Sequence, residues 1–204
     1  FPPQVLNIKT LQVLVLRNNP IKEIPNDISR LKTLKKFIIS FNLLSELPPG
    51  LFLLDNLQHL DIAYNDISFI HNDIKKLRQL EILNIEGNQL SALPSGLLNL
   101  PLKYLRIENS FIHPLLWNEQ NQNQPQKLIH LAALCFSRNN LRERYTDISE
   151  DIKKILDNCT ACDCCSGPRY GRGLCLVQVY RNVFRFGRLP FYFHACSSSC
   201  RRAF

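Results

Sequence analysis

The stretch Leu34-Lys-Lys-Phe-Ile-Ile-Ser-Phe-Asn-Leu-Leu44 contains a pattern that returns along the whole first half of the chain. Its asparagine recurs every 23 residues, and a fifth copy, one residue early, has Ser instead: Asn19, Asn42, Asn65, Asn88 and Ser110. In each copy, apolar residues stand eight, five and three residues before this position and two residues after it. A period held over five copies predicts a stack of similar structural units.

This spacing is the signature of a leucine-rich repeat, L-x-x-L-x-L-x-x-N-x-L. Its alternating apolar residues predict a short strand whose leucines point inward, and the Asn amide can satisfy backbone groups of the neighbouring coil. Apolar residues spaced by three, such as Ile28 and Leu31, predict a 3₁₀ or short helical turn on the convex side. We therefore predict an α/β fold, a leucine-rich repeat solenoid with parallel strands on its concave face. Five copies in one frame argue against an ordinary amphipathic helix.

The pattern begins in the middle of a repeat. Pro2 and Val5 stand where Pro25 and Ile28 stand one repeat later, and the sequence contains no Met. Solenoids need a polar cap at each end, and none precedes Phe1. We therefore expect a fragment whose N-terminal repeats, and any localisation signal with them, are missing.

Composition divides the chain into four segments. We predict leucine-rich repeats over 1–117, a polar linker over 118–126, a helical segment over 127–158 with helices at 127–136 and about 147–157, and a cysteine-rich tail over 159–204. Two strands are expected in the tail, separated by Gly187-Arg188. The chain has no apolar run long enough for a membrane span.

Charge and cysteine are concentrated toward the C-terminus. The net charge is +8, and all eight cysteines fall at or after Cys135. From Cys164 onward there are seven Arg and no Asp, Glu or Lys. This basic tail leaves a nucleic-acid-binding adaptor as one alternative function, although the nearly neutral repeats argue against nucleic acid as the main partner. No phosphate-binding loop or catalytic motif is present, so we predict no enzymatic activity.

The concave face is the predicted partner-binding surface. Strand positions between the leucines, and the two positions after them (which include Ser40 and Ala63), should face solvent there. Exposed aromatic residues flanked by charges are typical of interface hot spots. The predicted binding residues are Val15, Ile38, Phe41, Asp61, Tyr64, Glu86, Arg106 and Glu108. The alternative is that Val15 and Ile38 only satisfy strand propensity.

Two close cysteine pairs in the tail predict a structural zinc site. A tetrahedral thiolate site needs paired ligands on tight turns, and a tail this short cannot build a sufficient apolar core. The predicted ligands are Cys162, Cys165, Cys196 and Cys200. Cys159 and Cys164 compete as alternative ligands, and His194 is another, although it fits better on a strand face. Disulfides and unligated thiols are the alternatives to metal.

Several segments resemble known families. Cys162-Asp-Cys-Cys-Ser-Gly-Pro168, the Arg188-Leu-Pro segment and Cys196-Ser-Ser-Ser-Cys200 look like the tail of cytosolic leucine-rich repeat-containing proteins 28 and 58. This resemblance implies a location in the cytoplasm, with the nucleus as an additional location. With the paired cysteines, it leads us to expect a small helical and zinc-ribbon-like C-terminal unit.

The helix predicted at 127–136 resembles the BC box of cullin–RING ligase receptors. Leu128, Ala132 and Phe136 occupy the places that in that family contact Elongin C, although Lys127 and Ala132 depart from the residues the family prefers. The resemblance implies a substrate receptor of an Elongin–cullin ubiquitin ligase, with Elongin C and a cullin as partners. The alternatives are a general scaffold in intracellular signalling, and a helix whose leucines cap the solenoid.

Overall fold

The structure is a computed structural model that describes residues 1–110, 125–145 and 147–201. Most of the predicted linker, 118–126, lies outside the described residues, as does the predicted end of the repeats at 117.

Contacts divide the described chain into two units. The repeat unit contains residues 1–110 and 179–191, and the second unit contains residues 125–178 and 192–201. This division differs from the segments predicted from the sequence. Residues 179–191 were predicted to belong to the cysteine-rich tail, 159–204, and here they belong to the repeat unit.

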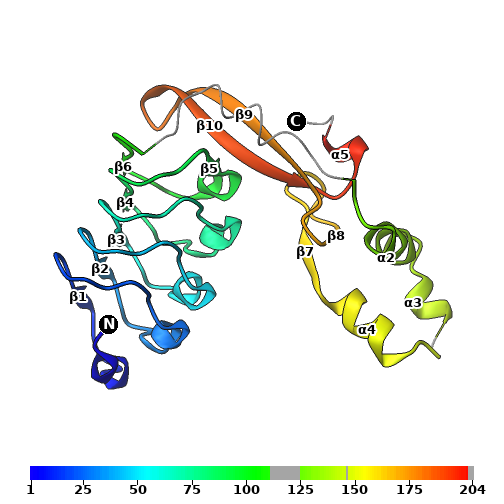
Figure 1. The fold of residues 1–204 in the computed structure, drawn as a ribbon, viewed down its shortest axis with the longest axis horizontal. Helices are drawn as coiled ribbons and strands as arrows, with labels where there is room; N and C mark the ends of the chain where they lie inside the picture. Colours follow the sequence, from blue (N-terminus) through cyan, green and yellow to red (C-terminus); the bar gives the residue numbers. More distant parts are fainter. Residues whose placement is uncertain (111–124, 146, 202–204) are drawn as a thin grey trace. The chain divides into compact units, whose positions relative to one another are not determined.

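Short parallel strands form one side of the repeat unit. They are β1 (Val13–Val15), β2 (Lys36–Ile38), β3 (His59–Asp61), β4 (Ile82–Asn84) and β6 (Tyr104–Arg106). The sheet has the order β1-β2-β3-β4-β6, so each coil adds one strand beside the previous one (Figure 1). Leu14 is in register with Phe37, and Phe37 with Leu60. Each 23-residue repeat of the sequence therefore adds one strand to the sheet.

The other side of each coil is a 3₁₀ helix, as the spacing by three predicts. These helices are η1 (Pro3–Asn7), η2 (Asn26–Arg30), η3 (Pro49–Leu53), η4 (Asn72–Lys76) and η5 (Ser95–Asn99). In η2, the Ile28 N–H donates to the Pro25 carbonyl at 3.0 Å, and the Leu31 N–H donates to Ile28 at 3.0 Å. Both Ile28 and Leu31 are completely buried. The core of the repeat unit thus lies between the strands and the 3₁₀ helices.

Buried asparagines join successive coils. The Asn65 side-chain carbonyl accepts from the Leu44 N–H at 3.0 Å, and its amide donates to the Ile39 and Ile62 carbonyls at 3.2 and 3.0 Å. Asn42 and Asn88 repeat this arrangement. The structure therefore confirms the predicted role of the repeat asparagine, whose amide bonds to backbone groups of the neighbouring coil.

The second unit combines helices with short strands. Its elements are α2 (Leu128–Arg138), α3 (Leu141–Arg144), α4 (Glu150–Asp157), β7 (Cys159–Ala161), β8 (Pro168–Tyr170) and α5 (Ser198–Arg201). β7 and β8 pair antiparallel. Neither these strands nor α3 and α5 are apparent in the sequence pattern, because each spans only three or four residues. None of the described helices is long and apolar enough to cross a membrane.

A long hairpin runs through both units. It consists of β9 (Leu174–Val183) and β10 (Phe186–Ala195), and β5 (Leu93–Pro94) pairs with β10. The turn was predicted at Gly187-Arg188, and this is wrong. Phe184 and Arg185 form it, with φ of 51° and 68°. A two-residue hairpin turn with both φ positive matches the right-handed twist of the strands, and here it forms without glycine.

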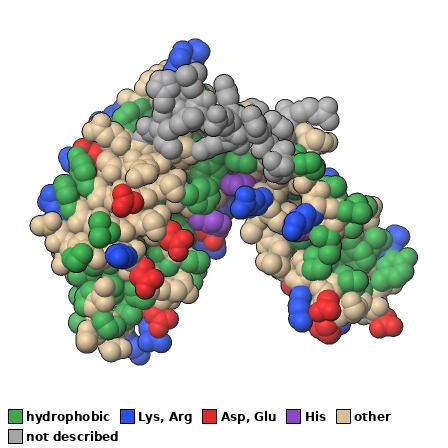
Figure 2. Space-filling view, viewed as in Figure 1, with side chains coloured by type: hydrophobic (Ala, Val, Ile, Leu, Met, Phe, Trp, Pro, Cys, Tyr) green, Lys and Arg blue, Asp and Glu red, His purple; other side chains and the backbone are tan. Residues whose placement is uncertain are grey.

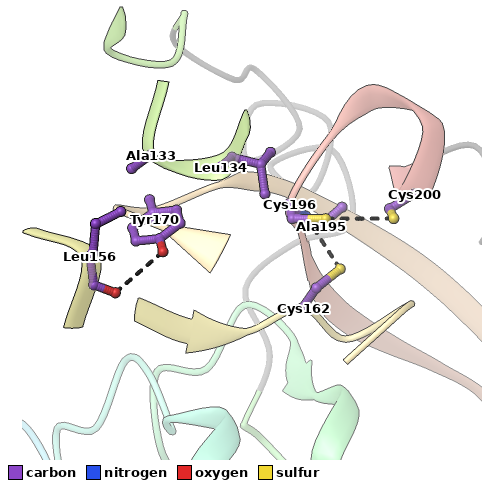
Figure 3. Close-up of a cluster of buried hydrophobic side chains, with 8 residues drawn as sticks. All are labelled: Ala133, Leu134, Leu156, Cys162, Tyr170, Ala195, Cys196 and Cys200. Atoms are coloured by element: carbon purple, nitrogen blue, oxygen red, sulfur yellow. Dashed lines mark hydrogen bonds between the residues drawn. The ribbon is translucent and has the colours of Figure 1, made fainter. Parts of the chain in front are cut away.

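The core of the second unit is small and rich in cysteine. Its buried residues are Ala133, Leu134, Leu156, Cys162, Tyr170, Ala195, Cys196 and Cys200 (Figure 3). The Tyr170 hydroxyl donates to the Leu156 carbonyl at 3.2 Å, which joins β8 to α4. Leu134 of α2 therefore packs inside this unit.

Replacing Asn65 with Ala should lower the free energy of unfolding by about 1–3 kcal/mol. The substitution leaves the Leu44 N–H buried without its partner, and such a group costs about 1–3 kcal/mol. The Ile39 and Ile62 carbonyls each lose one donor but keep the amides of Asn42 and Asn88. Urea denaturation monitored by circular dichroism measures the change.

Asn19→Ala is the matched control for this change. Asn19 has the same place in the repeat pattern, but it is exposed, and among the described residues its side chain donates to the Leu16 and Arg17 carbonyls of its own coil. Asn19→Ala should lower the free energy of unfolding by less than about 1 kcal/mol. Equal losses at both positions would contradict the role assigned to the inter-coil hydrogen bonds.

Candidate functional site

The predicted partner-binding residues lie on the strand side of the repeat unit. Val15, Phe41, Tyr64, Arg106 and Glu108 are exposed. Ile38, Asp61 and Glu86 are half-buried. Charges of both signs therefore surround apolar and aromatic side chains on this surface, which we call the concave face.

Two residues of one column do not face solvent as predicted. Ser40 and Ala63 are buried, with exposed fractions of 2% and 1%. They follow the inward-pointing Ile39 and Ile62, where the chain leaves the extended strand. The simple alternation of a strand therefore no longer decides which way their side chains point.

The sequence analysis missed a second column on the concave face. These residues precede the central leucine of each strand: Val13, Lys36, His59, Ile82 and Tyr104. Val13 and Tyr104 are among the exposed large apolar side chains. Strand alternation could have identified the column, since residues two apart in a strand point to the same side.

Aromatic side chains form a stack along the edge of the concave face. The Phe41 and Tyr64 rings are parallel within 16°, with centroids 4.5 Å apart. The Arg17 guanidinium lies 4.8 Å from the Phe41 ring centroid. Both rings remain accessible, with exposed fractions of 41% and 40%. The stack is thus a preassembled apolar surface with a cation at one end.

The backbone at the stack has a left-handed conformation in every coil. The residues are Asn18, Phe41, Tyr64, Gly87 and Asn109, with φ between 51° and 63°. This conformation is strained for bulky residues such as Phe41 and Tyr64. Gly87 leaves room for the Tyr64 ring, because a Cβ there would lie 2.5 Å from Tyr64 Cδ1.

Hydrogen bonding fixes the outer end of Tyr64. Its hydroxyl donates to Glu86 Oε1 at 2.6 Å. This hydrogen bond to a carboxylate raises the pKa of Tyr64, so the phenol remains a neutral donor. The ring is therefore held both by stacking on Phe41 and by Glu86.

A hollow of about 300 Å³ lies on the concave face. It is lined by His59, Asp61, Ile82, Leu83, Asn84, Tyr104 and Arg106. Burial lowers the pKa of His59 and the nearby Lys36 lowers it further, whereas Asp61 opposes the shift. His59 therefore presents a neutral imidazole to the hollow at physiological pH.

The four predicted metal ligands come together in the second unit. The sulfur atoms of Cys162, Cys165, Cys196 and Cys200 all lie within 4.8 Å of one another. Cys196 Sγ is 3.7 Å from Cys165 Sγ and 3.6 Å from Cys200 Sγ. Four sulfurs arranged tetrahedrally about 2.3 Å from a zinc ion would be about 3.8 Å apart. The group could therefore hold a metal ion, and these distances are far longer than a disulfide bond of about 2.05 Å.

Two turns bring these ligands together. The loop between β7 and β8 carries Cys162 and Cys165, and the end of β10 with α5 carries Cys196 and Cys200. The Cys196 N–H donates to Cys162 Sγ at 3.3 Å, which fixes one pair against the other (Figure 3). The geometry therefore arises from the packing of the hairpin base against the β7–β8 loop.

Backbone donors favour the thiolate form of one ligand. Burial opposes ionisation of Cys162, but N–H groups of Cys165, Cys164 and Cys196 outweigh it and lower the pKa of Cys162 to about 7. Burial raises the pKa of Cys196 to about 12, and its hydrogen-bonded thiol neighbours add to the shift. A bound dication would remove this difference, because metal-bound thiols are deprotonated.

The alternative ligands are not members of the four-cysteine group, although the Cys164 thiol hydrogen-bonds to that of Cys200. Cys159 and Cys164 are exposed, and neither belongs to the group. His194 lies on β10, where its backbone N–H donates to Asp163 Oδ2 at 2.7 Å and its ring contacts Tyr192. The grouping thus matches the predicted four ligands without a histidine.

The helix α2 exposes the residues predicted to contact Elongin C. Leu128 is 81% exposed, Ala132 is exposed, and Phe136 is half-buried. Between α2 and α4 lies an apolar groove of about 510 Å³, lined partly by Ala132, Phe136 and Ile152. Figure 2 shows hydrophobic side chains gathered over the helical part of this unit.

Comparisons with known proteins agree with the repeat architecture. Residues 32–90 and 10–31 match two families described as leucine rich repeat. The chain is 43% identical over 103 residues to Leucine-rich repeat-containing protein 63 of Homo sapiens, and 42% identical over 106 residues to that of Mus musculus. The human match covers 50% of this chain and 17% of that protein.

A solved structure supports the fold. A leucine-rich repeat protein of Leptospira interrogans matches with 33% identity and a TM-score of 0.53, covering 54% of this chain and 28% of that one.

The curated relatives named above are leucine-rich repeat-containing protein 63, so the predicted resemblance to proteins 28 and 58 in particular is not supported. The comparisons do not confirm the predicted zinc-ribbon-like C-terminal unit, although its four cysteines lie together. Residues 10–90 are leucine-rich repeats, and the chain is similar to leucine-rich repeat proteins over about half its length.

Proposed function

We propose that the concave face binds a protein partner and that the aromatic stack is its hot spot. Leucine-rich repeat domains are generally non-enzymatic scaffolds that bind proteins, and this chain carries one. The observation that carries the proposal is the accessible Phe41–Tyr64 pair, already ordered by Arg17 and Glu86. Rigid aromatic side chains lose little conformational entropy on binding, which favours them at hot spots.

Replacing Phe41 and Tyr64 with Ala should weaken partner binding by about 2 kcal/mol or more. A photoreactive amino acid at position 41 first captures the partner, which mass spectrometry identifies. Titration calorimetry with the purified partner then measures the affinity of each variant.

Leu53→Ala is the control, because Leu53 is similarly exposed but lies on the 3₁₀ side of its coil. It should leave the affinity unchanged. Unchanged affinity of the Phe41 and Tyr64 variants would contradict a hot spot here. Global unfolding on substitution would show that these side chains are structural.

We propose that the four-cysteine group is a structural zinc site. A dication held by four thiolates would join the β7–β8 loop to the base of the hairpin, and metal binding of this kind contributes directly to folding. The small core supports this function, because three of its eight buried residues are these cysteines.

We also propose that the protein works in a reducing compartment, the cytoplasm or nucleus. The support is that the sulfur atoms of the four-cysteine group are too far apart for disulfide bonds.

Purified protein should contain about one zinc per chain, and removing it should unfold the second unit alone. Hydrogen exchange should rise at Leu134 and Leu156 after chelation, whereas the buried strand residues Leu60 and Leu83 stay protected. Elemental analysis gives the stoichiometry. Metal-free protein with unchanged protection, or a disulfide within the group, would reject the site.

We propose further that α2 docks on Elongin C, which would make the chain a substrate receptor of a cullin ubiquitin ligase. The support is the exposure of Leu128 and Ala132 at positions four apart, which lie on one side of a helix. The burial of Leu134 within the second unit disfavours a helix that caps the repeats. A general signalling scaffold, which would not bind Elongins, is the alternative outcome of the test.

Leu128→Ser should abolish binding to the purified Elongin B–Elongin C complex without a measurable change in melting temperature. An exposed leucine contributes little to stability, whereas one inserted in a partner's groove contributes much. Leu131→Ser, on the same helix but outside the predicted motif, should retain binding. Wild-type protein that fails to bind the complex would reject the ligase proposal and leave the concave-face proposal standing.

A further inference from the structure

One cationic side chain contacts the cysteine group directly. Arg138, the last residue of α2, donates from Nη2 to Cys196 Sγ at 3.1 Å and to Ser197 Oγ at 3.4 Å. Cys196 is itself buried and adjoins the sulfurs of Cys165 and Cys200. Arg138 therefore meets the most central sulfur of the group from a helix that contributes none of the ligands.

A second arginine lies close to the same cysteines. Arg169 is only 9% exposed, and its guanidinium donates to the carbonyls of Gly171 and Arg172 at 3.1 and 2.6 Å. Its charge interacts with Asp163 and Cys162. A buried guanidinium is costly unless negative charge lies nearby.

The positions of Arg138 and Arg169 suit a group of four thiolates. Four thiolates and one dication carry roughly two net negative charges, which two arginines would offset. Arg169 already has the Asp163 carboxylate nearby, so its burial does not require ionised thiols. The contact from Arg138 to Cys196 Sγ is the one that a thiolate would strengthen, because charge-assisted hydrogen bonds are stronger than neutral ones.

We propose that Arg138 is a positioning residue of the metal centre, which holds the Cys196 thiolate in place and offsets part of the negative charge of the ligand set. The inference rests on the zinc site proposed above and assigns a role to a residue outside the cysteine motifs. Partners of this kind orient metal ligands and tune the metal. Because Arg138 ends α2, the same contact ties the helix that exposes Leu128 to the metal centre.

The test uses the full chain as wild type and as Arg138→Met, Arg138→Lys and Arg142→Met variants. Arg142 is the matched control, because it is an exposed arginine of the same helical region that pairs with Asp157 instead of a cysteine. Zinc affinity is measured by competition with a chromophoric chelator. The thiolate-to-metal charge-transfer absorption is measured after replacement of zinc by Co²⁺.

Arg138→Met should lower zinc affinity about 10- to 100-fold, as loss of such partners typically does. Its Co²⁺ charge-transfer absorption should shift to lower energy, because a thiolate that loses a hydrogen-bond donor gives up electron density more easily. Arg138→Lys should lie between Met and wild type, since it keeps the charge. Arg142→Met should match wild type in both measurements.

Wild-type affinity and absorption in Arg138→Met would overturn the role of Arg138 while leaving the zinc site intact. Equal weakening by Arg138→Met and Arg142→Met would also overturn it, because the effect would then be general. If Arg138→Met does not fold, an unshifted Co²⁺ absorption in Arg138→Lys overturns the role and a shifted one supports it. Wild-type protein that binds neither ion would overturn both proposals.

Discussion

The repeat unit depends on hydrogen bonds that buried asparagines make between coils. No single coil can bury its own apolar edge or satisfy the backbone of its own turn. Asn65 connects backbone groups of its own coil with those of the preceding one, and Asn42 and Asn88 do the same. Side chains on the concave face therefore keep a fixed spacing, which allows Phe41 and Tyr64 to stack before any partner arrives.

The second unit achieves its stability differently. Its apolar core is small, and a region of this size usually requires a staple. The gathered cysteines occupy the position where such a staple would join a loop, the base of a hairpin and the end of α2. With zinc at this place, the two units would respond differently to chelation, so the binding proposed at the concave face and the binding proposed at α2 could be tested separately.

Much of the architecture follows from residue spacing. The period of Asn and leucine predicts the strands and 3₁₀ turns, and the paired spacing of Cys162 with Cys165 predicts a shared site with the later pair. The hairpin turn was misplaced because glycine marks such turns in most sequences, whereas Phe184 and Arg185 adopt positive φ here. The column from Val13 to Tyr104 was missed because only positions after the central leucine were considered.

The order of residues along the chain is enough to identify the repeats, the apolar side of each strand and the closely spaced cysteines, because these are local patterns of chemistry and spacing. The burial of Ser40, the stacking of Phe41 on Tyr64 and the contact from Arg138 to Cys196 emerge only when the chain has folded. Each of these contacts joins residues from different coils or elements. Their geometry depends on how neighbouring backbones pack, and a linear pattern does not contain that information.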